Sequence, residues 1–296
     1  MNAAKTPLSI DARLPRRSVI DRTVDLDVGT VDAFHRDGHV VVRNLASRSE
    51  IARYRPAIEA AVQRLALRYP PIAERDTYGK AFIQALNLWR RDARIKRFVF
   101  SARFARVAAD LMGVPGVRLY HDQALFKEPD GGHTPWHQDQ AYWPLDTEDT
   151  ITMWMPLVDI PAEIGTMTFA SGSHSKGELG RFIIGDESHE RFGEVVERLG
   201  FEEHTFGAMK AGDATFHRGL TLHRAAANLT SIMRGVMTII WFADGTRVSA
   251  DIGGARFNDH KFWLAEIPPG ELAAGPLNPL LWPRPERRVR STRPGC

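Results

Sequence analysis

Apolar residues in the first part of the chain recur with the period of a helix. Between residues 49 and 69 they are spaced by three or four, at Ile51, Tyr54, Ile58, Val62 and Leu65. This spacing predicts an amphipathic helix that ends at Pro70–Pro71. A second helical pattern follows over residues 95–113, and a shorter one over residues 30–34. Residues 39–44 (HVVVRN), which follow the shorter pattern, are rich in β-branched side chains and predict a strand.

After Gly113 the pattern changes to short apolar or alternating runs that are separated by Gly, Pro, Asp and Ser. These runs are residues 117–126, 150–158, 165–170, 213–216 and 232–242. Several short strands with turn residues between them indicate a sandwich or a barrel. The sequence therefore predicts a mainly β protein with flanking helices, in the α+β class.

The same pattern suggests one large domain. We expect a loose arm over residues 1–27 and a single domain over residues 28–282, with a helical part (28–113) and a β core (114–245). Residues 178–210 are charged and partly helical, and they interrupt the strands. Such an insertion is either a lid at the barrel mouth or a surface excursion over a sheet face, and the sequence leaves both open.

Composition limits the classes of protein. Hydrophobic residues make up 43% of the 296 residues and charged residues 25%, which is typical of a globular chain. No apolar run approaches the roughly 20 residues that span a bilayer, and the first residues lack the apolar core of a signal peptide. The one cysteine is Cys296, so an internal disulfide, a thiolate metal cluster and an internal catalytic thiol are excluded. We expect a cytoplasmic protein without a membrane partner.

The net charge of +3 is unevenly placed. The Pro- and Arg-rich tail, residues 283–296, carries five arginines and one glutamate, so the rest of the chain is slightly acidic. A basic tail of this kind is typical of a solvated end more than of a nucleic-acid site. We expect no nucleic-acid partner, and the sequence does not reveal the oligomeric state.

The first segment with candidate chemistry is His133–Gln140, which reads HTPWHQDQ. His137 and Asp139 are separated by one residue, and on a strand such residues lie on the same face. An imidazole and a carboxylate on one face supply half of a metal site. Alone, however, an H-x-D pattern arises in many chains by chance.

A second segment, residues 212–234, supplies the remaining groups. A Gly-Asp turn opens a strand, histidines follow at 217 and 223, and Arg234 stands in an apolar strand. A buried guanidinium needs an anionic partner, and its planar fork suits a carboxylate. Two histidines and one carboxylate make up the facial triad of non-heme Fe(II) oxygenases, which leaves positions open for a 2-oxo acid and O₂.

In this combination the chain resembles the phytanoyl-CoA dioxygenase family of Fe(II)/2-oxoglutarate oxygenases. The resemblance runs from F-x-x-D-G at residues 34–38 to the strand that holds Arg234. It includes W-H-Q-D at 136–139, the G-S-H turn at 172–174 and the run of Gly, Asp, His, Asn and Arg over 212–234. The family fold that it implies is a double-stranded β-helix, a jelly roll.

The resemblance implies roles for particular residues. His137, Asp139 and His223 would bind the metal, and Arg234 would bind 2-oxoglutarate with the help of Lys127 and Trp154. His217 competes with His223, but the arginine stands eleven residues after His223, as the family pattern requires, while Asn228 stands eleven after His217. Gln123 alternates with Leu125 and Lys127 along one strand face, so it is a further candidate for the co-substrate.

The aromatic residues beside the H-x-D motif, Trp136, Tyr142 and Trp143, are candidates to line an apolar substrate pocket. We read His121 and His133 as structural or rim residues. The resulting hypothesis is a dioxygenase that uses Fe(II), 2-oxoglutarate and O₂ to hydroxylate a small or mid-sized organic metabolite, with release of succinate and CO₂. The same cofactors also support desaturation, cyclisation or epimerisation. A non-catalytic binding protein on the same fold is the rival from another class.

Overall fold

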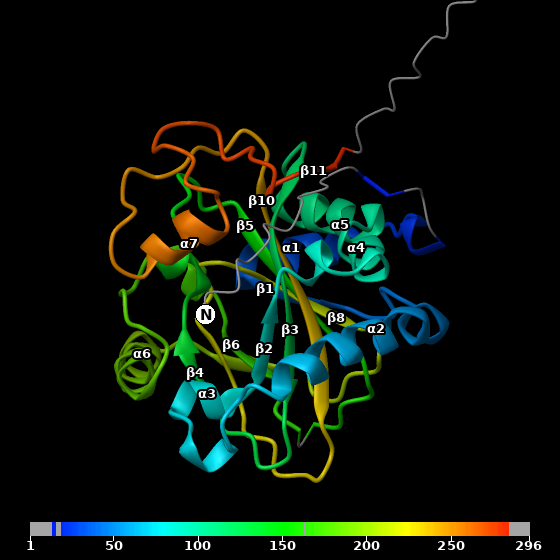
Figure 1. Ribbon diagram of the computed structural model, residues 1–296. Helices are drawn as coiled ribbons and strands as arrows, with labels where there is room; N and C mark the ends of the chain where they lie inside the picture. Colours follow the sequence, from blue (N-terminus) through cyan, green and yellow to red (C-terminus); the bar gives the residue numbers. More distant parts are fainter. Residues whose placement is uncertain (1–13, 16–18, 163, 284–296) are drawn as a thin grey trace, which may run out of the picture.

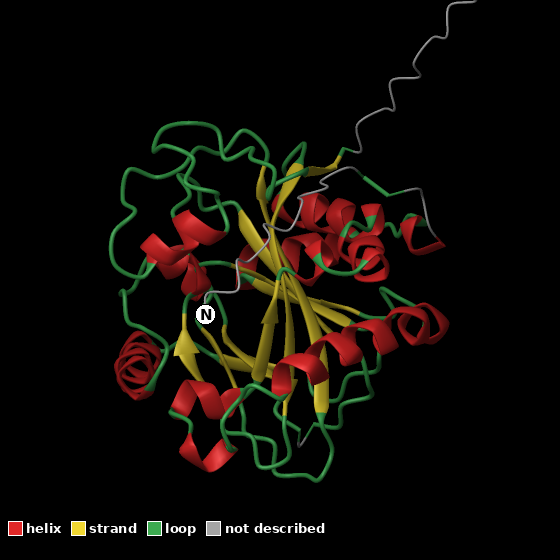
Figure 2. Cartoon of the chain, in the orientation of Figure 1, coloured by secondary structure: helices red, strands yellow, loops and turns green. Residues whose placement is uncertain are grey.

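The computed structural model describes residues 14–15, 19–162 and 164–283. Two antiparallel sheets form its centre, and helices cover the outer face of the larger one (Figures 1 and 2). The helices, including 3₁₀ segments (η), are η1 (Val19–Asp21), α1 (Val28–Asp37), α2 (Arg48–Ala66), η2 (Ile72–Glu74), α3 (Thr77–Ala81), η3 (Leu88–Arg90), α4 (Ala93–Val99), α5 (Ala102–Met112), η4 (Asp139–Tyr142), η5 (Ser173–Lys176), α6 (Asp186–Leu199) and α7 (Arg256–Phe262).

The larger sheet has seven strands in the order β1-β8-β5-β10-β3-β11, with β2 paired to β3, and the smaller one has the order β4-β9-β6-β7. The strands are β1 (His39–Val42), β2 (Ile83–Leu86), β3 (Val117–Lys127), β4 (Thr134–His137), β5 (Thr150–Pro156), β6 (Met167–Ala170), β7 (Glu203–Thr205), β8 (Ala214–Arg218), β9 (His223–Ala225), β10 (Arg234–Ala243) and β11 (Leu280–Trp282).

The helix α2 shows how local sequence signals define an element. Ser47 caps its first turn, and Glu50 completes a capping box by bonding back to the Ser47 amide. The predicted apolar stripe is buried except at its last position, Leu65. The stripe packs, together with α4 and α5, on the outer face of the larger sheet (Figure 1).

That outer face is the main hydrophobic core. On β10, Met237, Ile239 and Trp241 point into the helical layer. The alternate residues of β10 point to the opposite, inner face, where Arg234 and Thr238 line a cavity. The alternation along a strand thus divides this sheet between a packed core and a site.

Several expectations of the sequence were incomplete. The single helical stretch expected over residues 95–113 is two helices, α4 and α5, separated at Ser101. β2, β7, β9, β11 and α7 carried no recognised signal. The domain boundaries stay a prediction, because the tail after residue 283 and most of the arm before residue 19 lie outside the described residues. No helix among the described residues is long and apolar enough to cross a membrane.

Candidate metal centre and cavity

Three side chains converge at one place on the inner face. The ligand atoms that His137, Asp139 and His223 offer lie within 4.8 Å of one another. Asp139 Oδ1 is 3.5 Å from His137 Nε2 and 3.8 Å from His223 Nε2. The strand pair β4–β9 brings the two histidines together, since His137 is the register partner of His223.

Asp139 reaches this place by a different route from the one that its spacing suggested. β4 ends at His137, and Asp139 begins the 3₁₀ turn η4. The turn, and not the alternation of a strand, therefore directs the carboxylate toward the two imidazoles. The predicted proximity holds, but the reasoning from a shared strand face was wrong.

Hydrogen bonds orient each of these side chains. His137 Nδ1 lies 2.7 Å from the Pro135 carbonyl oxygen and His223 Nδ1 lies 2.9 Å from that of Thr221. A carbonyl only accepts, so both Nδ1 atoms carry the proton and both Nε2 atoms keep a free lone pair. Asp139 Oδ2 accepts from Thr152 Oγ1 at 3.0 Å, which leaves Oδ1 directed at the imidazoles.

The protonation states suit a cation at this place. Burial lowers the pKa of His137 and that of His223 to about 4, and a neighbouring imidazole adds to each shift, so both rings are neutral at pH 7. Burial opposes ionisation of Asp139, but His223, His217 and His137 together hold its pKa far below the usual range. Two neutral imidazoles and one carboxylate are the donor set of a non-heme Fe(II) centre.

His217, the rival ligand, lies beside this group. Its Nε2 is 3.3 Å from Asp139 Oδ2, on the oxygen that Thr152 also contacts. It is buried on β8 and its ring centroid is 4.3 Å from that of His223. The geometry gives His217 the position of a partner of the carboxylate, while the three converging ligand atoms belong to the other residues.

The converging side chains face a cavity of about 350 Å³. Arg234 lies in its wall and is almost fully buried, with 2% of its surface exposed. Its guanidinium stacks 5.3 Å from the Trp154 ring centroid, and its Nη1 donates to the Gly165 carbonyl. Its Nε has no hydrogen-bond partner among the described residues. Burial lowers the pKa of Arg234 to about 9.

Gly165 is required where it stands. Its φ is +48°, and a Cβ there would lie 2.4 Å from the carbonyl oxygen of Ala226. Only glycine tolerates both conditions, so the close approach of the Ala226 carbonyl and the placement of Gly165's own carbonyl at Arg234 both depend on it. The arginine is thus fixed in place by a neutral acceptor and retains its full charge for an anion.

The other candidates for the co-substrate differ in position. Gln123 and Trp154 line the cavity, and Gln123 accepts a hydrogen bond from Gln84 Nε2 at 2.6 Å. Lys127 pairs in register with Arg234 on the neighbouring strand, but it is not among the described residues of the cavity wall. Its Nζ donates to the Gly132 carbonyl. Burial, with the charge of Arg234 beside it, lowers the pKa of Lys127 to about 6.

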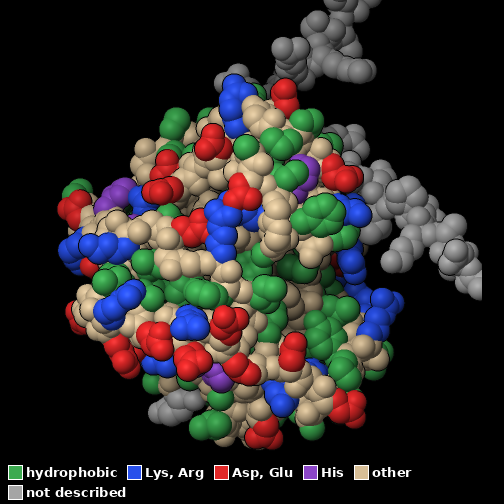
Figure 3. Space-filling model, turned by 90° about the vertical axis from the view of Figure 1, so that its left-hand side faces the viewer, with side chains coloured by type: hydrophobic (Ala, Val, Ile, Leu, Met, Phe, Trp, Pro, Cys, Tyr) green, Lys and Arg blue, Asp and Glu red, His purple; other side chains and the backbone are tan. Residues whose placement is uncertain are grey.

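The far part of the cavity is mostly aromatic. Tyr142, Trp143 and His121 line it, whereas Trp136 packs in a separate cluster under α6. Sequence reasoning missed further lining residues, which come from segments without a recognised motif: Tyr78, Phe82, Gln84, Asn258, Asp259, Phe262 and Trp263. Figure 3 shows a hollow bordered largely by hydrophobic side chains on the face that carries α6 and α7.

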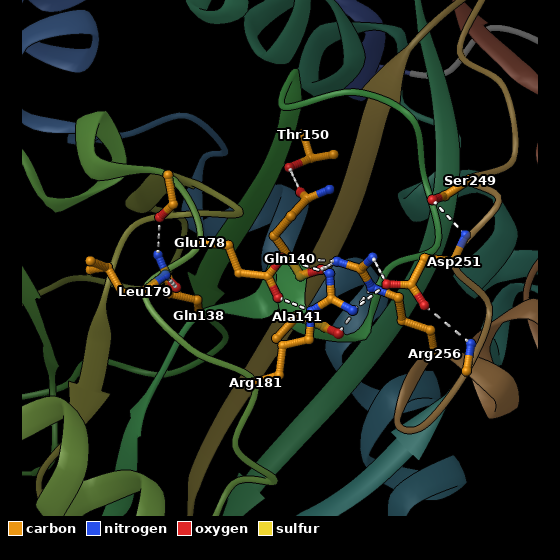
Figure 4. Close-up of polar contacts among 12 residues, drawn as sticks. Gln138, Gln140, Ala141, Thr150, Glu178, Leu179, Arg181, Ser249, Asp251 and Arg256 are labelled. Atoms are coloured by element: carbon orange, nitrogen blue, oxygen red, sulfur yellow. Dashed lines mark hydrogen bonds and ion pairs between the residues drawn. The ribbon is translucent and has the colours of Figure 1, made fainter.

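Two loops meet at this side of the cavity through a cluster of charges, here called the clasp and made of Glu178, Arg181, Asp251 and Arg256 (Figure 4). Arg181 pairs with Glu178 and with Asp251. Arg256 lies 3.3 Å from Asp251 and 3.5 Å from Glu178. The clasp joins the segment before α6, which carries the lining residues 183 and 184, to the segment that leads into α7.

Neighbours of His137 and Asp139 in the sequence hydrogen-bond the two loops that the clasp joins. Gln138 donates to the Gly177 carbonyl at 3.0 Å and accepts from the Leu179 amide at 2.8 Å (Figure 4). The backbone oxygen of Ala141 accepts from Arg256 Nε at 3.3 Å. The short segment of residues 137–141 therefore presents two of the three converging side chains to the cavity and hydrogen-bonds both loops around it.

Comparison with known proteins agrees with this architecture. The family model of phytanoyl-CoA dioxygenase (PhyH) matches residues 34–236, and the chain therefore belongs to that family. With that membership it is an Fe(II)- and 2-oxoglutarate-dependent dioxygenase that acts on a small molecule.

Individual relatives are distant. A phytanoyl-CoA dioxygenase of Arabidopsis thaliana is 23% identical over 266 residues, which cover 77% of this chain and 93% of the relative. The 1-deoxypentalenic acid 11-beta-hydroxylase of Streptomyces exfoliatus is 32% identical over 126 residues, or 40% of this chain and 43% of the relative.

Among solved structures, the non-heme alpha-ketoglutarate-dependent carbocyclase SnoK from nogalamycin biosynthesis superposes with a TM-score of 0.67. The sequences are 23% identical, and the match covers 86% of this chain and 96% of SnoK. The predicted jelly-roll core with flanking helices is confirmed.

Proposed function

We propose that His137, Asp139 and His223 hold the Fe(II) of this dioxygenase through His137 Nε2, Asp139 Oδ1 and His223 Nε2. The two Nδ1 protons are committed to backbone carbonyls, so the imidazoles cannot turn away from the metal. Bound there, Fe(II) would let O₂ oxidise 2-oxoglutarate and the substrate together, with one oxygen atom going into succinate, the other into the hydroxylated product, and CO₂ released.

Arg234 binds the distal carboxylate of 2-oxoglutarate in this proposal. The observation that carries it is a fully charged, buried guanidinium without an acidic partner in the described structure, in the same cavity as the converging ligands. The ring of Trp154 holds the guanidinium flat, and Gln123 offers an amide nearby. Lys127, the register partner of Arg234, stands behind the cavity wall and donates to the Gly132 carbonyl, so its part is to support the strand that carries the arginine.

The reaction that we propose is hydroxylation of a small or mid-sized organic molecule. Tyr142, Trp143 and Trp263 supply an apolar wall that excludes water from the reacting carbon. Cyclisation and epimerisation remain alternatives, since a carbocyclase and the epimerase SnoN are among the structural neighbours.

Reconstitution tests this proposal directly. Under anaerobic conditions, Fe(II) should raise the melting temperature of the wild-type protein, and 2-oxoglutarate should raise it further only when metal is present. On exposure to O₂, succinate should form from 2-oxoglutarate. A protein that binds the metal but never forms succinate, with or without candidate substrates, would be a binding protein on the same fold.

A further inference from the structure

The strand β3 has one extra residue where it passes the metal site. Ile240 on β10 pairs with His121, but its neighbour Trp241 pairs with Leu119, so Tyr120 is the bulged residue. A β-bulge re-aims side chains and is common beside active sites. Tyr120 packs with Trp143 on the inner side of the sheet, and His121 lines the cavity. The bulge therefore places the side chains of two successive residues, Tyr120 and His121, on the inner face of the larger sheet.

The bulge fixes an acidic side chain in the cavity wall. The hydroxyl of Tyr120, which is fully buried, donates to Asp259 Oδ2 at 2.8 Å. Asp259 stands on α7 and lines the cavity in a half-buried position. The Trp263 side chain also hydrogen-bonds this carboxylate. A carboxylate offers about four acceptor sites, so these two bonds leave capacity for a ligand. Burial raises the pKa of Asp259, and the charge of Asp139 raises it further.

The positive charges around Asp259 are either distant or already paired. Arg256, one turn earlier on α7, pairs with Asp251 and Glu178. Arg234 and Ile240 are six residues apart on β10, about 20 Å along an extended strand. The arginine and the bulge, which lies beside Ile240, therefore stand at opposite ends of this part of the strand. The other arginine of the wall, Arg224, pairs with Glu203 at 2.6 Å. No lysine is among the described residues that line the cavity.

The surroundings of Asp259 suit a positive group attached to a ring. Trp143, Phe262 and Trp263 line the same part of the cavity. Aromatic faces attract cations, and they also pack well against flat apolar bodies. His121 is neutral at pH 7, because burial lowers its pKa to about 4, so it does not repel a cation.

We propose that Asp259 selects the substrate of this enzyme, and that the substrate is a ring-containing molecule with a basic amine that pairs with this carboxylate. The proposal rests on the dioxygenase function proposed above, and it assigns the chemistry of the substrate end of the same site. Tyr120 is a positioning residue, which holds the carboxylate toward the cavity.

Three probes that differ only in their polar end test the proposal: tryptamine, tryptophol and indole-3-acetate. Their binding to the anaerobic Fe(II)- and 2-oxoglutarate-loaded protein is measured by titration calorimetry. We expect tryptamine to bind most tightly and indole-3-acetate least. Asp259→Asn should weaken tryptamine by about tenfold or more, the loss of a charged hydrogen bond, and should leave tryptophol almost unchanged.

Two further variants distinguish binding of the amine by Asp259 from a purely structural role of Asp259 in α7. Tyr120→Phe removes the buried partner of Asp259 but keeps the carboxylate, so the preference for tryptamine over indole-3-acetate should persist. Asp32→Asn, on an exposed position of α1, controls for net charge and should change no probe. A change in all three probes alike in Asp259→Asn and Tyr120→Phe would show that Asp259 only anchors α7, which overturns the proposal.

Other outcomes also decide the matter. The proposal is wrong if wild-type protein binds none of the probes at millimolar concentration, binds tryptophol as tightly as tryptamine, or keeps its preference in Asp259→Asn. The wild-type response to 2-oxoglutarate is measured in the same preparation. If the co-substrate still stabilises the protein and forms succinate, these outcomes refute the role of Asp259 and not the dioxygenase function.

Discussion

Replacing Arg234 by methionine should stabilise the free protein and abolish its response to 2-oxoglutarate. The guanidinium is buried with 2% exposure and has no acidic partner in the described structure, so the free protein bears the cost of a desolvated charge. Methionine has a similar length and carries no charge. The variant therefore removes that cost, and with it the group that we propose for the distal carboxylate.

The structure gives the size of both effects. Burial lowers the pKa of Arg234 from 12.5 to about 9, which at about 1.4 kcal/mol per pKa unit penalises the charged form by on the order of 5 kcal/mol. The bond to the Gly165 carbonyl and the Trp154 ring offset about 2 kcal/mol each. The remaining gain of about 1 kcal/mol corresponds to a rise in melting temperature of roughly 2–4 °C.

The loss in binding is larger. Nε and the second terminal nitrogen are the donors available for a carboxylate, and each charged hydrogen bond contributes about 1.5–3 kcal/mol. The dissociation constant of 2-oxoglutarate should therefore rise by about a hundredfold or more. Arg234→Lys should recover only part of the affinity, since lysine lacks the planar fork.

The assay is thermal unfolding of the Fe(II)-loaded protein under anaerobic conditions, over a range of 2-oxoglutarate concentrations. Arg103→Met is the matched control. Arg103 is also buried, with 7% exposure, but it donates to both carboxylate oxygens of Glu50 at 3.0 Å. Its removal strands a carboxylate that is largely shielded from water, and it should lower the melting temperature by an amount that reflects about 3 kcal/mol, while the response to 2-oxoglutarate persists.

The two arginines should thus respond with opposite signs in the free protein. If Arg234→Met lowers the melting temperature as much as Arg103→Met does, the guanidinium is already satisfied, and the argument from an unpaired charge fails. If Arg234→Met is stabilised but still responds to 2-oxoglutarate, the charge is unpaired as argued, and the carboxylate binds elsewhere.

The remaining predictions concern other parts of the site. His223→Ala should abolish Fe(II) binding in anaerobic calorimetry, whereas His217→Ala should weaken it by about 10–100-fold, and the reverse order would exchange their roles. Lys127→Met should raise the dissociation constant of 2-oxoglutarate only about threefold, since the buried amine lies outside the cavity wall and its lowered pKa leaves it mostly neutral at pH 7; a hundredfold rise would place it in direct contact. Burial raises the pKa of Asp259 to about 7, above its unfolded value, so its contribution to stability is present at low pH and is lost as the pH rises through 7. Asp259→Asn should therefore show a smaller fall in melting temperature between about pH 5 and pH 8 than the wild type, and an equal fall would remove Asp259 from the titration. A chain that ends at Pro283 should keep the kcat of the full chain, because the deleted tail carries none of the proposed site residues, and a large fall would show that the tail contributes to the site.

Periodicity predicted the elements that have one apolar face. The stripe of α2 and the long apolar strands β3, β5 and β10 carry their signal locally, because each must bury a face against the same core. The short elements lack such a signal. β9 has three residues, and only its pairing with β4 and β6 makes it a strand.

Some residues of the candidate site likewise carry a signal in the sequence, and others do not. His137, Asp139, His223 and Arg234 could be proposed from sequence because their residue types and spacing are demanding. Asp259 could not, since its place depends on an extra residue in β3, more than a hundred residues earlier, that turns Tyr120 toward α7. A bulge leaves no mark in hydrophobic periodicity, and a single aspartate on a short helix has many ordinary explanations.

The bonds of Gln138 have a consequence for how this scaffold can be altered. Gln138, between His137 and Asp139, hydrogen-bonds the backbone of the segment before α6, at the Gly177 carbonyl and the Leu179 amide. Any loop that offers a carbonyl and an amide at those two positions satisfies it. The side chains of the lining residues Ile183 and Ile184 can therefore be varied without loss of these two bonds, whereas Arg181 must stay because it closes the clasp. Substrate preference could in this way change while residues 137–141 stay the same.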